Sequence, residues 1–192
     1  MTYPADALAT FYAQEGLPAD GGISATTDRV TAFGVPMTIP NPPLRARVLP
    51  IHDLHHLLTG YGTDEVGEGE VSAWALGAGN RHHLFGLVYD SGAFLIGLLQ
   101  GPRRLFSAFV RGRRGRTLYD QPAAHWMDMT VEALAAHCGV DVEVEADWRD
   151  RLAFAITVPL AMGIATLLPV VSLVGVLRGG ERPAPFVGVS LR

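Results

Sequence analysis

The chain contains no lysine: its 15 basic residues are all arginine, and 19 acidic residues give it a net charge of −4 at pH 7. Proteins that bind nucleic acids need a basic surface, so this balance gives no reason to expect a nucleic-acid partner. The lack of lysine, together with many alanines and glycines, is typical of a GC-rich bacterial genome. It says nothing about mechanism.

Cysteine is almost absent as well. Cys138 is the single one, which excludes an intrachain disulfide and a zinc site made of several cysteines. The opening residues, MTYPADALAT, lack a basic segment followed by an apolar core, so they do not predict a secretory signal. We therefore expect a protein of a reducing compartment, with most of its 192 residues in one domain.

Charged residues are few, at 18% of the chain against 48% hydrophobic residues, and two segments account for the imbalance. From Leu84 to Leu99 the only charge is Asp90, and apolar residues lie all round the expected helix, which must then be buried. The segment is too short to span a bilayer. We expect a core helix with Asp90 paired to an arginine. The alternative is that its small residues leave room for a lipid tail: Gly86, Gly92, Ala93 and Gly97.

The second segment, residues 152–177, has no charge and lies between Arg151 and Arg178. Its length makes it a candidate for membrane insertion. Pro159 and Pro169 would either kink a spanning helix or divide the segment into an apolar hairpin. The alternative is that the segment packs on the rest of the protein.

Histidines and carboxylates are concentrated between His52 and Glu68, in the string HDLHHLLTGYGTDEVGE. Pro50 suits the first turn of a helix, and Gly60 suits its end. On this helix His52 and His56 are four residues apart and share one face. A turn and a second helix would bring Glu68 back toward both histidines. Two imidazoles and a carboxylate suit zinc, manganese or ferrous iron.

The spacing alone does not select the metal ligands. His55 shares the face of His52, and Asp53 lies at its edge. The H-E-x-x-H signature is absent because Asp53 follows His52, and two histidines at this spacing are often purely structural. A metal phosphohydrolase of the HD type would need a further histidine upstream, and none precedes His52.

The string resembles the metal motif of the coenzyme Q biosynthesis protein 4 family. It fits H-D-x-x-H followed by eleven residues and Glu, and the intervening residues fit closely too. The resemblance spans roughly residues 45–140, with a weaker match in RGRRGR, Leu118-Tyr119, Trp126 and VEALAAHCGV. The segment ahead of the motif departs from the family, which carries a longer helical portion there, and so does the apolar tail.

The resemblance implies a divalent metal, zinc first and manganese or iron as alternatives, on His52, Asp53, His56 and Glu68. Asp53 is either a fourth ligand or a partner that orients a histidine. The resemblance also implies ubiquinone or related prenylated-quinone biosynthesis. There the protein would be an enzyme that removes the ring carboxylate of a prenylated aromatic acid and hydroxylates that carbon, with the same four residues catalytic. The alternative is a non-catalytic isoprenoid-binding scaffold that organises a biosynthetic complex at a membrane.

Six arginines follow Gly101-Pro102 within a short stretch. Such a run is either a solvated face or a site for anionic head groups or a prenyl diphosphate. We take Asp90, Arg103 and Arg104 as candidate lipid- or phosphate-binding residues. The expected partners are an isoprenoid lipid or prenylated aromatic, a membrane surface, and a biosynthetic complex or homo-oligomer. The expected location is the cytoplasmic side of a bacterial membrane, peripheral or anchored by residues 152–177.

The sequence thus predicts a mainly α fold. A compact helical domain with a helix-turn-helix metal site occupies residues 1–150. It includes a short β-hairpin within residues 29–39, where β-branched residues flank Gly-Val-Pro. Residues 151–192 form an apolar C-terminal helix or helical hairpin, embedded in a membrane or packed on the domain.

Overall fold

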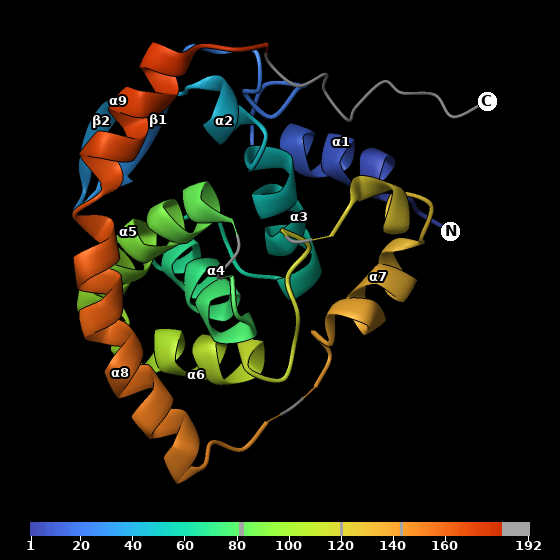
Figure 1. Cartoon of the computed structure of the whole chain (residues 1–192). Helices are drawn as coiled ribbons and strands as arrows, with labels where there is room; N and C mark the ends of the chain where they lie inside the picture. The colour runs from blue at the N-terminus through green and yellow to red at the C-terminus, as the bar shows by residue number, and fades with distance from the viewer. Residues whose placement is uncertain (81–82, 120, 143, 182–192) are drawn as a thin grey trace.

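Helices α4 (Glu65–Ala78) and α5 (Leu84–Gln100) lie at the centre of the molecule, and the other elements are arranged around them (Figure 1). The computed structural model describes residues 1–80, 83–119, 121–142 and 144–181. Within these ranges the protein is mainly helical, as the sequence predicts.

The chain begins with α1 (Pro4–Gln14) and an antiparallel hairpin of β1 (Thr27–Ala32) and β2 (Val35–Pro40). Phe33 and Gly34 both have positive φ, 54° and 73°, which is typical of the tight turn that joins two antiparallel strands. The predicted β-hairpin near the N-terminus is therefore confirmed. A short helix, α2 (Pro43–Ala46), then leads into the helix that carries the histidines.

Helices α3 (Leu49–Thr59) and α4 form the predicted helix-turn-helix. Pro50 lies in the first turn of α3, and Gly60 ends the helix in the left-handed conformation with φ 76°. Asp64 precedes α4, and its side chain accepts a hydrogen bond from the Gly67 amide at 2.7 Å. These local signals turn the chain back on itself between the histidines and Glu68.

Helix α5 crosses α4 at two glycines. A Cβ atom on Gly97 would lie 2.8 Å from the Cα of Gly69, so the two backbones approach as closely as they do only because both residues lack side chains. Gly97 therefore serves helix packing and leaves no room for a lipid tail. The prediction of a core helix holds, since Val88 and Phe94 are fully buried.

The arginine-rich segment forms a helix, α6 (Pro102–Gly112), which packs on α4. A short 3-10 turn, η1 (Ala123–His125), and α7 (Val131–Cys138) follow. One part of the core fills the space between α3, α4 and α7, where the largest side chains are fully or almost fully buried: Leu54, Trp74, Leu118, Trp126 and Leu134.

The apolar tail forms two helices, α8 (Trp148–Ala165) and α9 (Leu168–Arg178), which meet at 45° and run along the outside of the body (Figure 1). No single helix of the described residues is long and apolar enough to cross a membrane; the two bent helices meet that test only together. The first of them is tied to α6, because Arg113 and Arg114 both donate hydrogen bonds to Asp150. The predicted apolar helical hairpin is thus a bent pair of helices. The predicted extension also includes residues 182–192, which lie outside the described residues.

Candidate metal centre

Three of the four predicted ligands lie together, two on α3 and one on α4. The Nε2 atom of His52 is 3.1 Å from Oε2 of Glu68, and the Nε2 atom of His56 is 3.3 Å from Oε1 of the same carboxylate. The two Nε2 atoms are 3.1 Å apart. Each residue therefore offers one ligand atom to a common point, and the described residues contain a candidate site for a metal ion.

This donor set fits a single divalent ion. Zinc–nitrogen bonds of about 2.0–2.1 Å place neighbouring ligand atoms of a tetrahedral site roughly 3.3 Å apart. The two Nε2 atoms are 3.1 Å apart, and each lies 3.1 or 3.3 Å from a different oxygen of Glu68. One ligand atom from each residue lies within 4.8 Å of the other two. Two imidazole nitrogens and a carboxylate oxygen suit zinc, manganese or iron, and three protein ligands leave room for a substrate or water in the remaining positions.

The ring nitrogen of His56 that faces away from Glu68, Nδ1, makes a hydrogen bond that fixes the tautomer of this histidine. His56 Nδ1 lies 3.1 Å from the carbonyl oxygen of Tyr61. A carbonyl oxygen can only accept, so Nδ1 must carry the proton, and the lone pair of Nε2 faces the site. The ring is 1% exposed, and its surroundings hold it in place. This is the arrangement that a metal-ligating histidine requires.

The remote nitrogen of His52 faces two further groups. Its Nδ1 atom lies 3.4 Å from the hydroxyl of Tyr119 and 3.8 Å from Oδ1 of Asp90. Asp90 is 2% exposed and accepts a hydrogen bond from the Asn80 amide at 2.6 Å. Among the described residues Asp90 pairs with no arginine, and α5 packs it against Asn80 and His52. Arg81, which follows Asn80, lies outside the described residues, so the expected arginine pair stays a prediction.

The structure also separates His55 and Asp53 from the ligand set. His55 is fully buried, and its Nε2 atom accepts a hydrogen bond from the Leu118 amide at 3.0 Å, so it serves the core. Asp53 accepts a hydrogen bond from the hydroxyl of Tyr12 on α1 and is not one of the three grouped ligands. The charges of His52 and His56 nevertheless act to lower the pKa of Asp53.

Burial and charge act against each other in this site. Burial opposes the charge on His52, but the hydrogen bond and charge of Glu68, with Asp90 and Asp53, raise the pKa of His52 to about 9. Burial would raise the pKa of Glu68, yet the two histidines hold that pKa below its usual value. Burial raises the pKa of Asp53 to about 6 and that of Asp90 to about 7. Three carboxylates around two imidazoles favour a bound cation.

The site is open on one side. The Glu68 side chain is 38% exposed and that of His52 18%, whereas His56 and Asp90 are buried. A ligand from solvent can therefore reach the carboxylate and His52 without moving the core.

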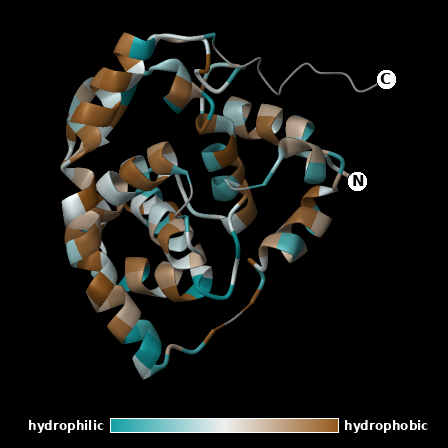
Figure 2. Cartoon of the chain, in the orientation of Figure 1, coloured by the Kyte–Doolittle hydropathy of each residue, from teal (hydrophilic) through white to brown (hydrophobic). Residues whose placement is uncertain are grey.

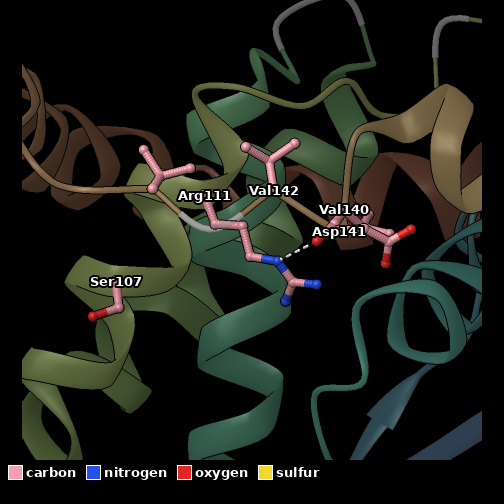
Figure 3. Close-up of a pocket in the computed structure, with 6 residues that line it drawn as sticks. Ser107, Arg111, Val140, Asp141 and Val142 are labelled. Carbon is pink, nitrogen blue, oxygen red and sulfur yellow. Dashed lines mark hydrogen bonds between the residues drawn. The ribbon is translucent and has the colours of Figure 1, made fainter.

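A separate recess of about 350 Å³ lies between α6 and the chain after α7 (Figure 3). Arg111 borders it and donates a hydrogen bond from Nε to the carbonyl oxygen of Val140 at 2.7 Å. None of the predicted ligands lines this recess. We therefore assign it no part in the candidate metal centre.

The predicted lipid- or phosphate-binding residues lie in different surroundings. Asp90 belongs beside His52, as described above. Arg104 forms two hydrogen bonds with the Glu70 carboxylate of α4, and Arg103 is exposed. No contact joins either arginine to Asp90 in the described part of the chain.

Two site residues were missed by sequence reasoning, Tyr119 and Tyr12. Tyr119 belongs to the weaker of the two matching segments, so the resemblance marked it without giving it a role. Tyr12 lies on α1, and no local pattern connects it to Asp53.

Comparisons of the chain with protein-family models, with curated proteins and with solved structures found no match. The functional conclusion therefore depends on the residues of the site and on the chemistry that they allow.

Proposed function

We propose that this protein binds a divalent metal through His52, His56 and Glu68 and acts in the biosynthesis of ubiquinone or a related prenylated quinone. Its reaction would release the ring carboxylate of a prenylated aromatic acid as carbon dioxide and hydroxylate the same carbon, with dioxygen as the oxidant. The observation that carries the proposal is the meeting of three donor atoms at ion spacing, with the remote nitrogen of His56 already protonated toward a carbonyl. The resemblance of the H-D-x-x-H…E string supplies the pathway.

The residues of the site divide into ligands and supporting groups. His52, His56 and Glu68 hold the ion, which is zinc by resemblance, with manganese and iron as alternatives. The bound ion would supply positive charge to polarise a substrate carboxylate or phenolate. Asp53 then acts from behind the ligands, where its charge and its hydrogen bond to Tyr12 steady α3 against α1.

A second candidate function is a non-catalytic isoprenoid-binding scaffold. It is favoured by one observation: the ligands come from two helices, so a metal would also join α3 to α4. Glu68→Gln separates the two functions. A catalytic site loses turnover while the fold is kept, whereas a structural metal site loses stability as well.

The proposal is tested by metal content. Wild type purified in detergent is expected to contain near-stoichiometric zinc, manganese or iron by elemental mass spectrometry, and His56→Ala is expected to lose it, because one of three ligands is removed. The control is His125→Ala, which removes an exposed histidine of η1 and should keep the metal. Wild type that folds well and holds no metal after reconstitution with these ions would contradict the proposal.

A further inference from the structure

Exposed apolar side chains gather on the tail. Ten of the nineteen large apolar residues that are exposed in the described part of the chain lie between Trp148 and Leu177. On α8 they recur every fourth residue and on α9 every third, so each helix presents one apolar stripe. Figure 2 shows apolar residues along both helices. Nine of the ten are more than half exposed, and these nine include the six apolar residues of the two stripes: Leu152, Ile156, Leu160, Val170, Leu173 and Val176.

The opposite sides of the same helices are already packed. The Phe154 ring lies 5.7 Å from that of Phe94 and 5.3 Å from that of Phe109. On α9, a Cβ atom on Gly175 would meet Pro42 at 2.9 Å. The two helices are therefore covered by protein on one side and bare on the other. A pair that crossed a bilayer would have to give up these contacts, so the arrangement favours helices that lie on a membrane.

The ends of the bare face carry the groups that a membrane interface favours. Trp148 is 68% exposed, and an indole at the rim of an apolar face is typical of the head-group region. Arg149 and Arg151 lie at the start of α8, and Arg178 lies at the end of α9. Arginines complement anionic head groups, and here they lie beside the exposed carboxylates of Glu145, Asp147 and Glu181. A second copy of this chain would present the same arginines again.

A recess opens beside this face. It has a volume of about 510 Å³ and lies between β2, α5 and α9. Leu173 and Val176 line it and also belong to the exposed stripe of α9. The recess and the exposed stripe of α9 are therefore continuous through these two side chains.

We propose that the bare face of α8 and α9 docks in the plane of an anionic lipid bilayer, with the stripes in the acyl boundary and the arginines at the head groups. The proposal does not depend on the reaction at the metal site. In this arrangement α8 and α9 lie on the membrane surface and keep their contacts with the rest of the protein, which a membrane-spanning tail would lose.

The test is flotation of the full chain with vesicles of phosphatidylcholine that contain phosphatidylglycerol. Wild type is expected to float with them. The double variant Leu160→Glu, Leu173→Glu is expected to lose at least about tenfold in partitioning, because each change puts a charge into the acyl boundary. The matched control is Phe33→Glu, Val35→Glu, which alters two exposed apolar residues of the hairpin and should float like wild type.

Trp148 gives a second measurement. Trp74 and Trp126 are buried while Trp148 is exposed, so vesicles of brominated lipid are expected to quench a fluorescence component that Trp148→Phe removes. Failure of wild type to float, or equal flotation of the Leu160, Leu173 variant, would overturn the proposal. So would a dimer in solution that this variant dissociates, since the face would then belong to a second copy. Resistance of bound wild type to alkaline carbonate would also overturn it, in favour of a spanning tail.

Discussion

Asp90 lies next to the candidate metal centre without supplying one of its three ligand atoms. Its carboxylate lies behind His52, on the side away from Glu68, and Asn80 holds it there. A carboxylate in this position favours the proton on Nδ1 of His52 and so leaves Nε2 free for a metal. Tyr119 supports the same nitrogen with its hydroxyl.

Replacing Asp90 by Asn is therefore expected to weaken metal affinity by about 10- to 100-fold, a range typical of lost partners behind metal-ligating histidines. The measurement is competition with a chelator of known affinity. The absorption spectrum of the cobalt-substituted protein reports whether the ligand set is kept. Asp150→Asn removes another buried carboxylate, remote from the ligands along α8, and should leave affinity unchanged. Equal affinities of wild type and Asp90→Asn would show that Asp90 is only a packing residue.

At the scale of elements, the close crossing of α4 and α5 sets the position of α5, and with it the position of Asp90 beside His52 on α3. Gly97→Ala would place a methyl group 2.8 Å from the backbone of Gly69. We expect the helices to separate, with a loss of about 1–3 kcal/mol in the free energy of unfolding and weaker metal binding. Urea unfolding and chelator competition measure the two effects.

Gly92→Ala is the matched control on the same helix. A Cβ atom there meets only Leu168, at an ordinary contact distance of 3.9 Å. Because alanine is the better helix former, this variant should be neutral or more stable by up to about 1 kcal/mol. If Gly97→Ala and Gly92→Ala had the same free energy of unfolding, the close approach of Gly97 to Gly69 would not explain a loss of stability in Gly97→Ala.

These two elements also show how far the sequence could predict the site. The helical period places His52 and His56 on one face, and Gly60 and Asp64 reverse the chain toward Glu68, so local signals bring these three residues together. The same signals do not separate them from His55 and Asp53, because both lie on or beside that face. The position of Asp90 depends on a contact between glycines in separate helices, which no local pattern encodes. From sequence alone, Asp90 is therefore grouped with Arg103 and Arg104 as a candidate lipid- or phosphate-binding residue.

One other prediction depended on similar information. For residues 152–177, apolar composition alone could not separate a packed helix from a membrane-embedded one. The structure shows that each helix has one packed and one exposed side. Which side of α8 is packed depends on contacts with side chains of α5 and α6, such as Phe94 and Phe109, which lie far away in the sequence.

At the scale of the whole molecule, one buried carboxylate fastens the tail to the body. Asp150 is 1% exposed and binds Arg113 and Arg114, and its amide and that of Asp147 complete a cap for α8. The hydrogen bond from Arg114, which outweighs the effect of burial, holds the pKa of Asp150 below its usual value. The ionised form is thus favoured more in the folded chain than in the unfolded one.

The sign of the pH dependence follows from that lowered pKa. Stability from Asp150 is fully present above the unfolded pKa of about 3.9 and is lost as the pH falls through the lower folded pKa. Asp150→Asn is therefore expected to cost about 2–3 kcal/mol near neutral pH, where it leaves two arginines without their shared partner. The cost should shrink in acid, because wild type then loses the same charge.

Chemical unfolding of both proteins from neutral pH down to about pH 3 measures this difference, since the change spans the usual range of aspartate pKa values. Asp128→Asn, at an exposed carboxylate, should follow wild type throughout. A cost that stayed constant with pH would assign the effect of Asp150 to the cap of α8, which a neutral asparagine also perturbs. A cost that shrinks as the pH falls toward 3 means that the charge of Asp150 holds α8 to the end of α6.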